Sequence, residues 1–91
     1  MRLEFTHSAR RHGISAERVA YVIEHCRKPL HDPALVGIPD GVLFLGLDWR
    51  GIPLEVGATE RADSVLQVFH AMALRRSYRP MLAEVLRWRE P

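Results

Sequence analysis

Residues 64–79 read SVLQVFHAMALRRSYR, and this stretch sets the pattern from which the rest of the chain can be interpreted. Val65 to Phe69 is rich in β-branched and aromatic residues, which favour a buried strand. We expect His70 at the exit of this strand, followed by a helix-forming run with three further polar side chains. They are Arg75, Arg76 and Tyr78. An imidazole, two permanent cations and a phenol suit contacts with a phosphodiester, although a basic helix after a last strand can equally be a solvated surface.

The length and composition indicate one globular domain. Ninety-one residues can form a single core, and 47% hydrophobic with 26% charged residues argues against disorder. Cys26 is the only cysteine, which excludes an intramolecular disulfide and a cysteine-based zinc site. The longest apolar run, Val42–Leu47, is too short to span a bilayer, and no long apolar segment follows the first charges. We therefore expect a soluble, cytoplasmic protein with no membrane partner.

The charges are unevenly distributed along the chain. Residues 1–31 carry six basic and three acidic side chains, and residues 75–91 carry five basic and two acidic ones. Residues 32–74 carry two basic and six acidic side chains, so basic ends flank an acidic middle. If the two ends meet in the fold, they form a positive patch that could hold phosphates.

The first half of the chain predicts a helix after a short strand or arm at residues 2–5. Residues 16–27 have helical periodicity, with Ser15 as N-cap and Pro29 beyond the end. The apolar face of this helix holds Val19, Val22, Ile23 and Cys26. Cys26 therefore reads as a small core residue rather than a nucleophile.

The second half predicts strands joined by tight turns. Residues 42–47 and 52–56 have strand patterns, and a weak strand is a candidate at residues 34–38. Neighbouring strands with short turns must be antiparallel. Pro80 either breaks a helix or starts a new one, and an apolar stripe follows it up to Trp88. The fold class is therefore α+β: N-terminal helices, a three- to four-stranded antiparallel sheet and a C-terminal helix, with the helices on one face.

The order of these features resembles the small bacterial toxins of the BrnT group, within the RelE/ParE-like superfamily of type II toxin–antitoxin systems. The resemblance covers residues 4–79, and its matching segments are Arg11-His12-Gly13-Ile14, Leu45-Gly46-Leu47, Leu54-Glu55-Val56, Val68 to Met72, Arg75-Arg76 and Tyr78. His70 and Met72 depart from the family pattern, which usually has serine and arginine there, and Arg11 replaces the usual lysine.

The resemblance implies a RelE-like fold and a metal-independent endoribonuclease, in which the RNA 2′-hydroxyl attacks the adjacent phosphate. It suggests His70 or Glu55 as general base, Arg75 and Arg76 as phosphate stabilisers, and Tyr78 as proton donor or orienting group. The expected substrate-binding residues are Arg76, His12, Arg11 and Arg61, with His12 and His7 as further base candidates.

The expected partners are a cognate antitoxin and RNA, which the ribosome could present, and a homodimer through the stripe near Trp88 is open. No metal site is expected, because His7 and His12 are five residues apart and suit one helix face poorly. No cofactor is expected either. The alternative is a catalytically inactive, toxin-like module that binds protein or nucleic acid.

Overall fold

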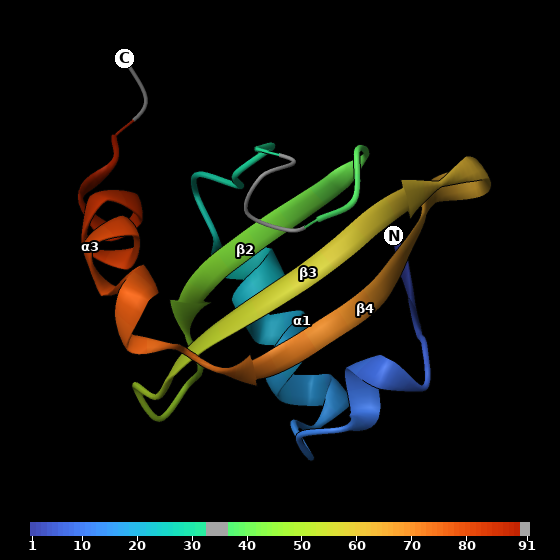
Figure 1. Ribbon diagram of the computed structural model, residues 1–91, viewed down its shortest axis with the longest axis horizontal. Helices are drawn as coiled ribbons and strands as arrows, with labels where there is room; N and C mark the ends of the chain where they lie inside the picture. Colours follow the sequence, from blue (N-terminus) through green and yellow to red (C-terminus); the bar gives the residue numbers. More distant parts are fainter. Residues whose placement is uncertain (33–36, 90–91) are drawn as a thin grey trace.

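Four strands form one sheet in the order β1-β4-β3-β2, and two α-helices pack on it in the computed structural model, which describes residues 1–32 and 37–89 (Figure 1). The elements are β1 (Arg2–Phe5), η1 (Ser8–Arg10), α1 (Ala16–His25), β2 (Gly41–Leu47), β3 (Pro53–Arg61), η2 (Ala62–Ser64), β4 (Val65–Ala73), η3 (Arg76–Tyr78) and α3 (Arg79–Arg87). Within these described residues, neither helix has the length and apolar character needed to cross a bilayer. The α+β class is confirmed.

The sheet is mixed, so the expectation of a wholly antiparallel sheet is wrong. β2, β3 and β4 form the antiparallel meander that their short turns dictate. β1 instead pairs in parallel with β4, with Arg2 opposite Val65 and Phe5 opposite Val68. The tight turns fix only the directions of consecutive strands, whereas β1 is separated from β4 by most of the chain and reaches it by a long crossover.

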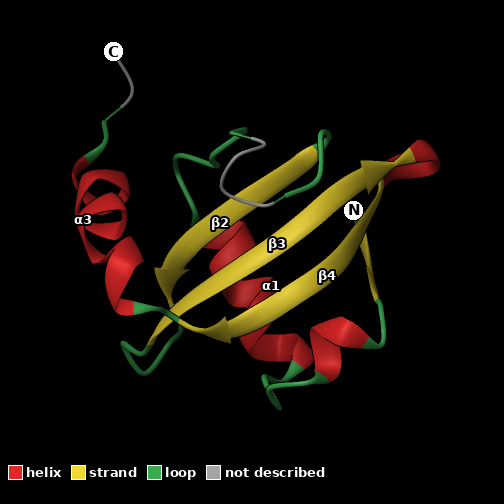
Figure 2. Cartoon of the chain, viewed as in Figure 1, coloured by secondary structure: helices red, strands yellow, loops and turns green. Residues whose placement is uncertain are grey.

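The two helices lie on opposite faces of the sheet, which corrects the expectation that they share one. Val19 and Val22 of α1 are buried in a core cluster with Phe44 and other residues of that face. Leu82 of α3 packs instead with Leu43, whose side chain alternates to the other side of β2. Figure 2 shows α1 crossing behind the strands while α3 stands beside β2.

The helix boundaries follow local capping. The Ser15 side chain accepts a hydrogen bond from the backbone N–H of Arg18 at 3.2 Å, which confirms the predicted N-cap. α1 ends at His25, two residues before the expected end, because Cys26 is already extended. Cys26 packs against the core, and burial raises the pKa of its thiol despite hydrogen bonds from the Lys28 and Leu45 backbone that lower it. Pro80 lies in the first turn of α3, so it starts a helix.

β4 is longer than predicted, and this changes the setting of His70. The strand continues to Ala73, so His70 lies inside it, opposite Gly57 of β3. No helix follows directly; Arg75 is extended and precedes the short turn η3. Pairing with β3 outweighs the helix propensity of the Ala-Met-Ala-Leu run. The candidate strand at residues 34–38 falls largely outside the described residues.

Candidate functional site

A buried carboxylate on the central strand β3 organises the site. Glu55 is fully buried, and its Oε1 accepts hydrogen bonds from Nε2 of His70 at 3.1 Å and from Nε of Arg75 at 2.6 Å. Glu55 shares a sheet face with His70 because Gly57, two residues along β3, lies opposite His70. The bend after β4 then brings Arg75 back over the same face. One carboxylate oxygen thus orients an imidazole and a guanidinium together.

Tyr78 holds the other end of Arg75. The short turn η3 begins with a hydrogen bond from the Tyr78 N–H to the Arg75 carbonyl at 3.0 Å. Nη2 of Arg75 donates to the Tyr78 hydroxyl at 3.3 Å, and the guanidinium lies over the ring at 4.8 Å from its centroid. The ring itself packs against the cluster that includes Leu82. Tyr78 therefore fixes the direction of Arg75 and is itself fixed by the core.

The second oxygen of Glu55 has an unusual environment. Oε2 is buried and, among the described residues, has no hydrogen-bond partner. Burying a carboxylate oxygen without a partner costs free energy, and native proteins leave few such atoms. Arg75 supplies the charge that balances this carboxylate, since a guanidinium stays protonated throughout the physiological range. A buried oxygen of this kind calls for an explanation other than stability.

His70 and Arg75 open onto a pocket of about 300 Å³, which the N-terminal residues Ser8, Arg11 and His12 also line. The hydroxyl of Ser8 in η1 donates to the carbonyl of Phe69 at 2.8 Å and ties this segment to β4. The pocket is lined by Ser8, Arg11, His12, Ile38, Leu43, Gly57, Phe69, His70 and Arg75. Two histidines and two arginines from distant parts of the chain therefore face one cavity.

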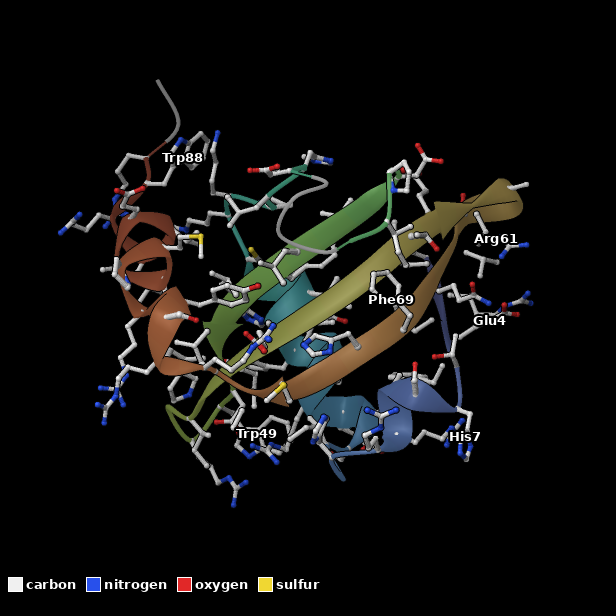
Figure 3. All side chains as sticks on the ribbon, viewed as in Figure 1. Glu4, His7, Trp49, Arg61, Phe69 and Trp88 are labelled. Carbon is white, nitrogen blue, oxygen red and sulfur yellow. The ribbon has the colours of Figure 1, made fainter. Side chains whose placement is uncertain are left out.

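Other predicted residues lie elsewhere. Arg76 is exposed at the start of η3 and does not line the pocket. Arg61 lies at the opposite end of β3, where its Nη1 donates to Gln67 at 3.1 Å. Figure 3 shows Arg61 near Glu4, at the far end of the sheet from Trp49. His7 precedes η1 and is exposed outside the pocket.

Five pocket residues were not assigned to the site from the sequence: Ser8, Ile38, Leu43, Gly57 and Phe69. Phe69 lies at a β-bulge, because the pairing register shifts between Gly57 and Ala58. An isolated glycine within a strand pattern, such as Gly57, is a known indication of a bulge or of a close approach by a neighbour. That indication was present in the sequence. No such indication existed for Ser8, because its role depends on where the N-terminal segment lies in the fold.

Asp48 is a second buried carboxylate, but its contacts are structural. Its Oδ1 accepts from the backbone N–H groups of Arg50 and Ile52, and its Oδ2 accepts from Nε of Arg18 at 2.9 Å. Burial acts to raise the pKa of Asp48, yet these backbone and Arg18 hydrogen bonds outweigh it and hold the pKa below its ordinary value. Asp48 thus closes the β2–β3 turn and fastens α1 to it.

No family model, curated protein or solved structure gives a significant match to the chain. Within the described residues, no group of three or more His, Cys, Asp or Glu side chains is placed to hold a metal ion.

Proposed function

We propose that the chain is an endoribonuclease that cleaves RNA through attack of the 2′-hydroxyl on the adjacent phosphate. The observation that carries this proposal is that His70, held by the buried Glu55, shares one pocket with a second histidine and two arginines. This set contains a proton acceptor, a proton donor and two cations. Those are the groups that RNA cleavage without metal assistance requires.

His70 acts as the general base in this mechanism. An ionised carboxylate only accepts hydrogen bonds, so Glu55 holds the proton on Nε2 of His70 and leaves Nδ1 with the lone pair. Nδ1 then takes the proton of the 2′-hydroxyl. Glu55 is fully buried and does not line the pocket, so it positions His70 and does not contact RNA.

The remaining pocket residues complete the reaction. The 2′-oxygen forms a bond to phosphorus, and the bond from phosphorus to the 5′-oxygen breaks. His12, protonated, gives its proton to the departing 5′-oxygen, while Arg11 and Arg75 stabilise the charge on the non-bridging oxygens. The products are a 2′,3′-cyclic phosphate and a 5′-hydroxyl. Tyr78 serves by holding Arg75, whose bonds to Glu55 and Tyr78 use two of its five N–H donors.

We further propose that this activity belongs to a RelE-like toxin of the BrnT group, controlled by an antitoxin. The support is the succession of an N-terminal helix, a strand meander and a basic turn after the last strand, together with the pocket that Arg11 and Arg75 line. A RelE-like relationship also makes RNA held on the ribosome a candidate substrate.

The experiment compares cleavage by the parent protein with that by His70→Ala and His12→Ala, on free RNA with a chelator present and on ribosome-bound RNA without one. Each substitution should lower the rate by about 10²–10⁴-fold, as expected for a general acid or base. His31→Ala is the matched control, because His31 is exposed and lies outside the pocket. Equal rates in all four proteins would contradict the assignment.

A second candidate function is protein binding, and exposed apolar residues favour it. Leu47, Trp49 and Leu86 are exposed and line a groove of about 460 Å³ between α1, α3 and the end of β2. Apolar patches of this kind on small proteins mark partner surfaces. Co-expression with the product of the adjacent gene tests this function. A complex that Trp49→Ala weakens supports it, whereas self-association alone would indicate a homodimer instead.

A further inference from the structure

Phe69 is a large aromatic residue outside the two hydrophobic cores that the described residues form. The core under α1 and the core under α3 are each defined by packed apolar side chains, and Phe69 is in neither of them. Its side chain is partly exposed and lines the pocket beside His70. Figure 3 shows Phe69 on the face of the sheet opposite α1, over the middle of β3 and β4. Core packing among the described residues therefore does not explain the aromatic ring.

The β-bulge places Phe69 and His70 on the same side of the sheet. Gly57 pairs with His70 and Ala58 pairs with Val68, so Phe69 has no partner on β3. A Cβ atom at Gly57 would lie 3.0 Å from Cε1 of Phe69 and 3.3 Å from Cβ of His70. Both side chains thus extend over Gly57, although consecutive residues of a regular strand point to opposite faces.

The surroundings of the ring contain groups that suit a nucleotide. The Ser8 hydroxyl fixes the carbonyl of Phe69, which holds the bulged residue in place. Arg11 and Arg75 line the same pocket and supply the charge that a phosphate requires. Proteins that bind single-stranded nucleic acid combine cations for the backbone with an aromatic ring on which a base stacks.

We propose that Phe69 is a stacking platform for one nucleobase of a single-stranded RNA substrate. This inference rests on the proposed function for the identity of the nucleic acid. The base lies on the Phe69 ring, its phosphate lies between Arg11 and Arg75, and its ribose faces His70. A base in a duplex is stacked on its neighbours, so the platform selects unpaired RNA. Stacking uses the aromatic surface that all bases share, so it discriminates little among them.

The test measures dissociation constants by NMR titration for two probes, adenosine 3′-monophosphate and ribose 5-phosphate. The first carries a base and the second does not. The parent should bind the nucleotide more tightly by about 5- to 100-fold, which is the usual contribution of one stacked base. Phe69→Ala should bring the two constants close together while leaving that of ribose 5-phosphate unchanged, and Phe69→Trp should keep the difference.

The outcomes separate this inference from the proposed function. If both probes bind to the parent with equal affinity, or if Phe69→Ala keeps the preference for the nucleotide, the stacking proposal is wrong and the proposed function stands. If Phe69→Ala binds neither probe while Phe69→Leu recovers the full preference for the nucleotide, Phe69 only fills space. The stacking proposal is then wrong. If the parent binds neither probe, the inference and the proposed function both fail.

Discussion

At the scale of single residues, two buried carboxylates have opposite roles. Asp48 has both oxygens in hydrogen bonds within its turn and to α1. Glu55 has one oxygen bound by two donors and the other without a partner among the described residues. The first is a satisfied structural group, whereas the second bears the cost of burying an oxygen without a partner.

Replacing Glu55 by glutamine separates orientation from packing. We expect Glu55→Gln to lower the cleavage rate by roughly 10–100-fold, because a neutral amide holds His70 and Arg75 less firmly than a carboxylate does. The free energy of unfolding should change by less than about 2 kcal/mol, since Arg75 is half exposed and water can solvate it. Cleavage assays and urea denaturation measure the two effects. Glu60→Gln, at an exposed position on the same strand, is the control. Full activity in Glu55→Gln would contradict the positioning role.

Asp48 predicts a pH dependence of stability. Its pKa is lowered in the folded protein, so its contribution is complete above the ordinary pKa of 3.8 and is lost as the pH falls through the lower, folded value. The parent should therefore be more stable than Asp48→Asn at about pH 6, and the difference should shrink as the pH falls toward about 3. Urea denaturation across this range checks the trend. A difference that grows with acidity would have the wrong sign.

At the scale of elements, the bulge in β4 places Phe69 beside His70 in the lining of the pocket. We expect Gly57→Ala to displace the Phe69 ring, because the added Cβ would meet Cε1 and Cζ at 3.0 and 3.1 Å. The contact is with the far end of a side chain, so the free energy of unfolding should fall by only about 1 kcal/mol. The preference for adenosine 3′-monophosphate over ribose 5-phosphate should also fall, because the Phe69 ring is displaced.

Gly46→Ala is the matched control for the bulge. Its added Cβ would meet Cγ1 of Val22 at 3.3 Å, on the face that α1 covers. This variant should lose stability and keep the nucleotide preference. A loss of preference in Gly46→Ala as large as in Gly57→Ala would show that general destabilisation, and not the bulge, governs the site.

The sequence predicted elements better than it predicted their ends. Helical periodicity and the Ser15 cap placed the start of α1 correctly, because both are local properties. The end of β4 was misplaced because pairing with β3 carries the strand past His70 to Ala73. The parallel pairing of β1 and the placement of α3 on the second face are long-range results that no local pattern reveals. His12 and Arg11 were named from the sequence, but their meeting with His70 depends on the crossover.

At the scale of the whole molecule, the net charge is only +2, yet the fold brings two arginines from distant parts of the chain to one pocket. The N-terminal segment contributes Arg11 and His12, and the turn after β4 contributes Arg75, to one pocket. Arg11 and Arg75 thus bring one arginine from each basic end of the sequence to this pocket. Most of the acidic side chains belong to the middle of the chain.

Binding of a short RNA should consequently weaken with salt, because each neutralised phosphate releases counterions. Arg75→Ala and Arg11→Ala should each flatten the slope of log affinity against log salt by about 0.7, the value for one contact with a single strand. Fluorescence anisotropy at several salt concentrations measures the slope. Arg87 lies at an exposed position of α3, so Arg87→Ala should leave the slope unchanged. A slope insensitive to both pocket arginines would place the RNA elsewhere.

The most direct measurement of the central claim is the chemistry of the cut ends. The purified protein is incubated with an RNA oligonucleotide and with its 2′-O-methyl counterpart, with a chelator present, and the fragments are identified by mass spectrometry. The proposed mechanism predicts fragments with 2′,3′-cyclic phosphate and 5′-hydroxyl ends from the RNA, and an intact 2′-O-methyl strand. Fragments with 3′-hydroxyl and 5′-phosphate ends, equal cutting of both strands, or no cutting of free or ribosome-bound RNA would contradict it.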